Sequence, residues 1–318
     1  MRRTIIIRLL LCPVILWAIY TITFLMAVIV PGNPFASGDR NLPKEVERAV
    51  RAQYKADDNW TFYWDYLEGL FNPIDAVREE GPLVDLGPSW QYRDWTCNQI
   101  VEAALPISVC LGLTAIFFSV VVGVPVGVIS AVKRDSWFDH TSLALALIGI
   151  SLPTFVTGTA LLILFAVTLR WLPAGGWGHL SQLWLPAITL SLPFMAYIAR
   201  LTRLGMLDVM NSDYIRTARA KGLNEWRVIW KHALKNAFLP VLSFLGPASA
   251  AALTGSFVIE SIFNVPGLGQ HFVASVLNRD RAMVLGTVLV YSAVIVLFNI
   301  LVDVVYSLVD PRISLEKA

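Results

Sequence analysis

The sequence predicts an all-α, polytopic membrane protein, and three observations support this class. Hydrophobic residues make up 56% of the 318 residues and charged residues only 15%, and the mean hydropathy is +0.62. This composition is too apolar for an ordinary soluble domain. Six apolar runs are each long enough to cross a hydrocarbon core, which needs about 20 residues of helix. A basic, amphipathic stretch at 213–240 separates two of these runs.

The six predicted transmembrane helices are about 5–30, 100–132, 141–169, 183–204, 237–259 and 282–308. Prolines interrupt the third and fourth runs, which helix bundles tolerate because neighbouring helices satisfy the freed backbone groups. The first run has the basic start of a signal peptide but no small-residue cleavage site, so we expect an uncleaved first helix. An even number of spans leaves both termini on the same side.

Basic residues predict which side faces the cytoplasm, because short cytoplasmic loops hold the excess of Lys and Arg. The N-terminus, residues 133–139, residues 200–236 and the C-terminal tail hold 15 of the 25 basic residues. We therefore expect both termini and these loops inside. We divide the chain into 1–99, the first span with an outer segment, and 100–318, a core of five spans.

The outer segment contains two patterns of its own. Pro43 starts a polar, helix-forming stretch at 43–50, and residues 60–71 are rich in aromatics. Aromatic rings are enriched both at membrane interfaces and at contacts with other proteins. The pattern therefore leaves open whether the segment lies at the interface or caps the pore mouth for a soluble partner.

Catalytic and metal-binding patterns are absent from the sequence. It contains no phosphate-cradling G-x-x-x-x-G-K-[ST] loop, no H-E-x-x-H and no G-x-S-x-G. We therefore predict no catalytic residue, no metal and no cofactor in this chain, with energy supplied by a partner or an ion gradient. Asp303, in the last apolar run, is the candidate buried charge; it is either functional or paired near the inner interface.

The basic stretch predicts two short helices joined by a glycine, here called the elbow (residues 213–236). On the first helix, Tyr214, Ile215 and Ala218 share a face with Gly222, and its small residues would admit another protein closely. Basic residues followed by Gly222 are typical of a helix end. A turn is expected there.

Asn224 is the predicted cap of the second helix, with Glu225 in its first turn. An apolar stripe follows at helical spacing, with a basic stripe beside it. The apolar stripe is Trp226, Ile229, Trp230 and Ala233, and the basic stripe is Arg227, Lys231 and Lys235. The pattern fits a docking element for another protein and a helix lying on anionic lipid equally well.

A resemblance favours docking. Residues 214–223, Tyr-Ile-Arg-Thr-Ala-Arg-Ala-Lys-Gly-Leu, with His-Ala-Leu-Lys-Asn-Ala at 232–237 and Leu-Pro at 239–240, resemble the coupling loop of ABC-importer permeases in its peptide-transporter form. The general family pattern is Glu-Ala-Ala-x-x-x-Gly, and Arg216-Thr217-Ala218 replaces its start here. Segments 30–34, 85–89, 266–269, 278–280 and 299–312 also resemble the B-type subunit of oligopeptide importers. Arg281-Ala282 stands where many relatives have a tyrosine.

The resemblance implies a type I ABC-importer permease fold and one half of an oligopeptide pore in the bacterial inner membrane. Implied partners are a C-type permease, two cytoplasmic ABC ATPases that bind ATP and Mg, an external peptide-binding protein and membrane lipid, and not nucleic acid. Dipeptides, cell-wall peptides or nickel are alternative substrates. A secondary carrier is a further alternative, but no acid is evident near a span centre.

The resemblance also implies roles for residues of the coupling loop, placed at 205–236. Residues implied in ATPase coupling are Tyr214, Arg216, Thr217, Ala218, Arg219, Ala220, Lys221, Gly222 and Glu225. Those implied in anchoring the second helix to the spans are Trp226, Trp230 and Pro240.

Overall fold

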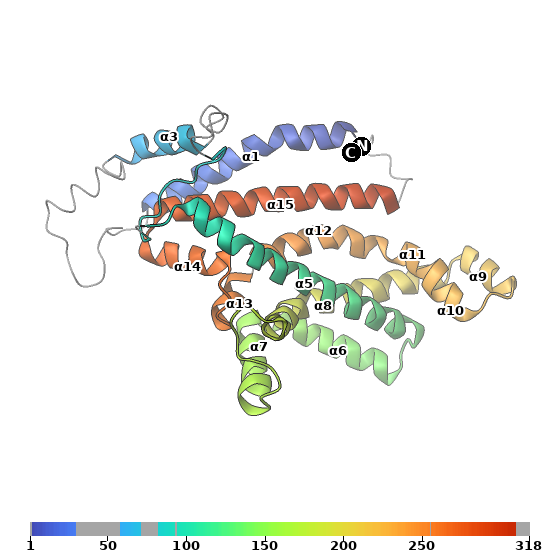
Figure 1. The fold of residues 1–318 in the computed structure, drawn as a ribbon. Helices are drawn as coiled ribbons and strands as arrows, with labels where there is room; N and C mark the ends of the chain where they lie inside the picture. Colours follow the sequence, from blue (N-terminus) through green and yellow to red (C-terminus); the bar gives the residue numbers. More distant parts are fainter. Residues whose placement is uncertain (1, 30–57, 71–81, 93, 255, 310–318) are drawn as a thin grey trace. The chain divides into compact units, whose positions relative to one another are not determined.

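The computed structural model describes residues 2–29, 58–70, 82–92, 94–254 and 256–309 (Figure 1). Within these ranges the regular structure is helical, apart from one isolated bridge between Pro88 and Thr96. The polar helix predicted at 43–50 lies outside the described residues. The elements are α1 (Arg2–Ile29), α3 (Asn59–Leu70), α5 (Cys97–Val132), α6 (Trp137–Ser151), α7 (Thr154–Leu161), η1 (Leu162–Thr168), α8 (Leu180–Met210), α9 (Asp213–Ala220), α10 (Glu225–Arg227), η2 (Val228–Ala233), α11 (Leu234–Ala237), α12 (Leu239–Thr254), α13 (Ser256–Ile262), α14 (Leu268–Asn278) and α15 (Arg281–Val309).

Four helices in the described ranges, α1, α5, α8 and α15, are long and apolar enough to cross a membrane, and two bent helix pairs raise the number to as many as 6. The pair at 137–168 bends by 109° and the pair at 225–254 by 55°. The third predicted span, 141–169, is therefore not one straight helix. Leu152 is extended and precedes Pro153, and a residue before proline is disfavoured in the α region.

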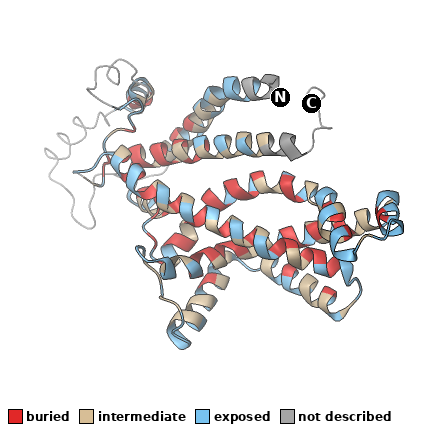
Figure 2. Ribbon diagram, turned by 45° about the vertical axis from the view of Figure 1, so that its right-hand side comes forward, coloured by how far each residue is buried: buried red, intermediate tan, exposed pale blue. Residues whose placement is uncertain are grey.

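The chain divides into two units, and the first, mainly Ser108–Pro266, contains the elbow. Its central helix is α8, which packs against α6, α7, α11 and α12. Buried residues occur along α8 from Leu185 to Met206 (Figure 2). Pro186 and Pro193 lie inside α8 without ending it, as expected for a helix surrounded by others.

A buried ion pair joins α6 to α8 in this first unit. Asp139 is 1% exposed, and its two carboxylate oxygens accept hydrogen bonds from Arg203 Nε at 2.6 Å and Nη2 at 2.7 Å. Ser130 also donates to this carboxylate, as does the backbone N–H of Asp135 at 3.0 Å. The sequence pattern placed Asp139 in a solvated loop, and the structure instead makes it a buried cross-link.

A second buried acid, Glu260, lies between the fifth and sixth predicted spans, a stretch that the span prediction leaves as a connecting loop. Residues 260–281 are not a loop, because they include the end of α13 and all of α14. The Glu260 carboxylate accepts hydrogen bonds from Ser108 Oγ and Ser256 Oγ, both at 2.7 Å, and the residue is fully buried. A buried carboxylate needs such donors to offset the loss of hydration. The side chain of Asp303, the predicted buried charge, lies outside the described part of the chain.

The second unit, Ile6–Ile107 with Gly267–Val296, buries much of the aromatic segment. Phe62, Tyr63 and Tyr66 of α3 are buried against Tyr20 and Phe24 of α1. The Tyr20 hydroxyl donates to the backbone carbonyl of Tyr63 at 2.9 Å. These rings therefore form a core, whereas Trp60 and Trp64 are exposed.

Asp280 connects the segment before α5 to the start of α15 in the same unit. Its Oδ2 accepts hydrogen bonds from Ser89 Oγ at 2.6 Å and from the backbone N–H groups of Trp90 at 2.9 Å and Gln91 at 3.1 Å. Its Oδ1 accepts from the N–H of Met283 at 3.1 Å, which caps the first turn of α15. One buried carboxylate thus fixes two segments that are far apart in sequence.

Candidate functional site

The elbow lies at one end of α8 and α12 (Figure 1) and begins with α9. The first residues of the predicted coupling loop, 205–236, lie in the last turns of α8, which continues to Met210. Ile215 and Ala218 of α9 are buried in a core cluster with Met206 of α8 and Val241 of α12. Ala218 therefore packs inside this chain and is not itself open to another protein, whereas Tyr214 and Gly222 of the same predicted face are exposed.

The predicted glycine turn is confirmed. Gly222 has φ +74, and its N–H donates to the carbonyl of Arg219 at 2.9 Å, while the N–H of Leu223 donates to the carbonyl of Ala218 at 3.4 Å. These two bonds form a Schellman motif, whose left-handed residue is usually glycine. The turn thus fixes the direction in which the chain leaves α9.

The second helix of the elbow is capped as predicted but is not a regular α-helix. Asn224 Oδ1 accepts a hydrogen bond from the N–H of Trp226 at 2.9 Å. Residues Val228–Ala233 form a π-helix, η2. A π-helix bonds at a spacing of five residues, and the fully buried pair Val228 and Ala233 has this spacing. Of the predicted apolar stripe, Ala233 is buried, Ile229 and Trp230 are half-buried, and Trp226 is exposed.

The residues that hold the second helix against the spans differ from those implied by the resemblance. Trp226 is 67% exposed, and its ring lies 5.2 Å from that of Trp230, which is half-buried. Pro240 is exposed in the first turn of α12, where its missing N–H is tolerated. Trp226 and Pro240 are therefore not anchors in this structure.

The contact that the sequence pattern missed is between α8 and α11. A Cβ on Gly205 would lie 2.5 Å from the carbonyl oxygen of Ala237, so only glycine allows this approach. Ala237 itself is 1% exposed. A glycine opposite an alanine is a small-residue contact typical of packed membrane helices. The presence of small residues in these two helices was the available sequence signal.

Two side-chain contacts brace the elbow internally. Arg219 Nε donates to Glu225 Oε1 at 2.7 Å, which joins α9 to α10 across the turn. Asn236 Nδ2 donates to the Tyr214 hydroxyl at 2.8 Å, which joins α9 to α11. An exposed ion pair contributes at most about 1 kcal/mol, and a neutral hydrogen bond contributes about as much, so these contacts orient the helices more than they stabilise them.

Eight of the nine residues implied in coupling are exposed on the elbow. They are Tyr214, Arg216, Thr217, Arg219, Ala220, Lys221, Gly222 and Glu225. Arg216 lies 3.5 Å from Asp213, so acids and bases alternate on this surface. A surface of mixed charge around an exposed glycine turn is suited to contact with a water-soluble protein.

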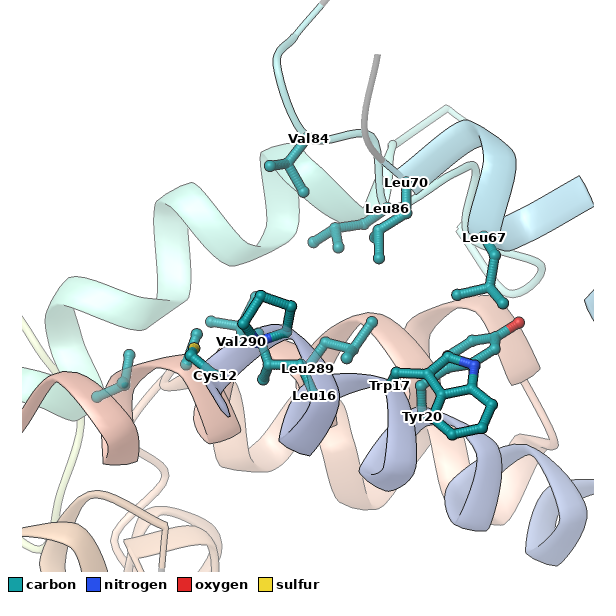
Figure 3. Close-up of a pocket in the computed structure, with 13 residues that line it drawn as sticks. Cys12, Leu16, Trp17, Tyr20, Leu67, Leu70, Val84, Leu86, Leu289 and Val290 are labelled. Carbon is teal, nitrogen blue, oxygen red and sulfur yellow. The ribbon is translucent and has the colours of Figure 1, made fainter. Parts of the chain in front are cut away.

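An apolar cavity of about 570 Å³ lies in the second unit (Figure 3). Its lining residues come from α1, α3, α15 and the segment before α5, and they include Cys12, Trp17, Leu86 and Leu289. Its lining contains no charged group to bind the ammonium or carboxylate of a peptide. The cavity is therefore unsuited to a charged peptide.

Helices long and apolar enough to cross a membrane, together with a braced and exposed elbow between two of them, define a multi-pass membrane protein. The chain belongs to the family described as binding-protein-dependent transport system inner membrane component, whose model matches residues 123–315. It is thus a multi-pass inner-membrane protein of a family of transport subunits. The predictions of this family and of the ABC-importer permease fold are confirmed.

Relatives with similar sequences cover nearly the whole chain. The oligopeptide transport system permease protein OppB of Salmonella typhimurium is 44% identical over 94% of both chains. The dipeptide transport system permease protein DppB of Bacillus subtilis is 41% identical over 94% of both chains. A solved structure of the MetNI methionine ABC transporter, in an inward-facing conformation, matches with a TM-score of 0.56 at 20% identity, over 67% of this chain and 97% of that one. This last similarity concerns the fold alone.

Proposed function

We propose that this chain is one of two transmembrane subunits of an ATP-driven importer of oligopeptides. The observation that carries the substrate class is the 44% identity to an oligopeptide permease over 94% of both chains. The other transmembrane subunit is a homologous C-type permease. An external peptide-binding protein delivers the substrate, and two cytoplasmic ATPases bind ATP and Mg and hydrolyse the ATP.

The elbow is proposed to dock on one of these ATPases, with both chain termini cytoplasmic. The basic loops support this orientation. Val228, Ala233 and Ala237 are buried against this chain's own helices, so a force on the exposed face of the elbow is transmitted to α8 and α12. A rigid docked element that moves packed helices is an established form of conformational coupling.

Uptake of a labelled tetrapeptide tests the substrate class. We expect cells that lack this gene to lose uptake of the tetrapeptide, and cells with the gene restored to regain it. A labelled dipeptide and nickel are measured alongside as competing substrates. Intact tetrapeptide uptake together with lost uptake of the dipeptide or nickel would keep the permease role and contradict the oligopeptide assignment.

Dipeptides are the second candidate substrate. The 41% identity to a dipeptide permease over the same share of the chain favours them nearly as much. The two candidates differ in the same uptake measurement, because loss of dipeptide uptake alone would select the second.

Replacing Arg216 by glutamate is expected to weaken retention of the ATPase subunits during purification. Arg216 is 73% exposed at its side chain and pairs with the exposed Asp213 at 3.5 Å, so its replacement leaves the buried core of the elbow intact. The charge reversal removes an attraction to acidic groups of the ATPase and adds a repulsion. The measurement is the ratio of ATPase to permease in the purified complex. We expect a fall of about tenfold, the size of losing one charged contact at an interface.

Arg134 offers a matched control, since it is also exposed and paired with a neighbouring acid, Asp135. Arg134→Glu is expected to leave the ratio unchanged. Equal ratios for wild type and Arg216→Glu would contradict a role for Arg216 in docking.

A further inference from the structure

A second hollow in the Ile6–Ile107 and Gly267–Val296 unit combines an apolar wall with two arginines. Its volume is about 370 Å³, and it is formed by α1, α14 and α15. Its lining residues are Thr23, Met26, Ala27, Phe272, Val276, Arg279, Arg281, Val284 and Val288. This hollow, here called the arginine groove, therefore has a cationic end and an apolar remainder.

The two arginines are held in different ways. Arg279 ends α14 in a left-handed conformation with φ 59, is exposed, and makes no ion pair among the described residues. Arg281 Nη1 donates to Asn59 Oδ1 at 2.7 Å, and its guanidinium lies 6.0 Å from the centre of the Trp90 ring. Arg281 is thus fixed in place, and Arg279 is available to an anion.

The surroundings of the arginine groove indicate the solvent that it meets. α1 and α15 are both long and apolar enough to cross a membrane, so the groove lies along membrane-spanning helices. Met26, on α1, is 65% exposed, and an exposed apolar side chain on a helix of span length is typical of a surface that meets lipid hydrocarbon. Arginine near a helix end reaches toward the headgroup region.

We propose that the arginine groove binds one anionic phospholipid. Its phosphate lies at Arg279 and Arg281, because guanidinium groups bind phosphate oxygens through paired hydrogen bonds. One acyl chain lies along Met26, Val284 and Val288. The larger cavity of Figure 3 has no cation in its lining, so it lacks the feature that would select an anionic headgroup.

The leaflet follows from the orientation given under Proposed function. The groove lies where α1 ends and α15 begins, which is the outer side if both termini are cytoplasmic. The lipid contact itself does not depend on the transported substrate. A failed uptake experiment would therefore not contradict the proposed lipid site.

Lipid retention measured by native mass spectrometry tests this proposal. The chain is purified from membranes with its co-purifying subunits and exchanged into nanodiscs that contain phosphatidylglycerol or phosphatidylcholine. We expect the wild type to retain one more phosphatidylglycerol than Arg279→Gln. The apparent affinity should fall about tenfold, as for the loss of one charged hydrogen bond.

Arg170 offers a close control. It is also exposed and left-handed, with φ 56, but it does not line the groove. Arg170→Gln should retain phosphatidylglycerol like the wild type. Equal losses in Arg170→Gln and Arg279→Gln would overturn the proposal, because the effect would then reflect overall charge.

Ala27→Phe tests the acyl-chain part of the groove without changing a charge. This variant should lose the bound phosphatidylglycerol although both arginines remain. Retention in Ala27→Phe would overturn the acyl-chain placement. A thiol placed in the groove by Val276→Cys reports on the occupant, because Val276 lines the groove and is 45% exposed. Protection of this thiol by the partner permease instead of by lipid, or retention of inorganic phosphate in place of lipid, would overturn the phospholipid as occupant.

Discussion

Replacing Gly222 by valine is expected to abolish peptide uptake while the chain still inserts in the membrane. Gly222 has φ +74, a conformation that costs an L-residue about 1–2 kcal/mol and is a genuine outlier for a β-branched one. The strain is relieved if the turn opens, which reorients α9 relative to α10. The measurements are labelled tetrapeptide uptake and the amount of chain in isolated membranes.

Asparagine at the same position is the informative comparison. A Cβ on Gly222 would meet nothing within 4 Å, so a side chain fits, and asparagine tolerates the left-handed conformation. We expect Gly222→Asn to keep most of the uptake. Normal uptake by Gly222→Val would contradict the docking role of the elbow, and equal loss in both variants would show that a side chain there blocks the contact directly.

Replacing Arg203 by alanine is expected to be the most destabilising single change considered. It would leave the Asp139 carboxylate, whose side chain is 2% exposed, without its bidentate partner. Breaking a buried ion pair on one side costs about 3–5 kcal/mol, because the remaining charge has no compensation. The measurement is the thermal unfolding midpoint of the chain in detergent, together with the yield of folded protein.

Arg134→Ala provides the exposed counterpart. Arg134 and Asp135 are 62% and 75% exposed at their side chains, so this loss should stay within about 1 kcal/mol. A double Asp139→Ala/Arg203→Ala variant should lose less than the sum of the single losses, since neither charge is then stranded. Similar midpoints for Arg203→Ala and Arg134→Ala would contradict a stabilising role for the buried pair.

The spans could be predicted from the sequence because bilayer thickness sets their length. The bend at Pro153 could not be located in the same way. Pro186 and Pro193 lie inside the unbroken α8, whereas Pro153 directly precedes a new helix. Proline removes one backbone donor in each case, and the packing of neighbouring helices decides whether a helix continues or ends.

The elbow was predictable where the chemistry is local. The glycine turn and the Asn224 cap each depend on a few consecutive residues, and both are confirmed. The orientation of the helices was not predictable from the same stretch. Ala218 was expected on an open face and is buried, and Trp226 was expected against the spans and is exposed. A helical projection shows which residues share a face but not which face meets the rest of the chain.

Buried charges were the least predictable feature. Asp139 and Arg203 are 64 positions apart, and Glu260 and Ser108 are 152 apart. From sequence alone, each acid is assigned to a loop because it lies next to an apolar run and its distant partner is not evident. The partner becomes apparent only when the helices pack. A carboxylate beside an apolar run is therefore weak evidence for either a solvated or a buried position.

Because of the π-helical segment η2, the number of residues in the elbow matters more for its geometry than the identity of its exposed residues. It holds one residue more than an α-helical stretch of the same number of turns. Deleting any one residue of Val228–Ala233 would restore the α spacing and rotate α10 by about 100° about the helix axis. The exposed Trp226 and the basic side chains would then turn together. Substitutions at exposed positions such as Lys231 leave the helix orientation unchanged. Insertions and deletions, more than replacements, would therefore separate the elbow from the ATPase proposed as its partner.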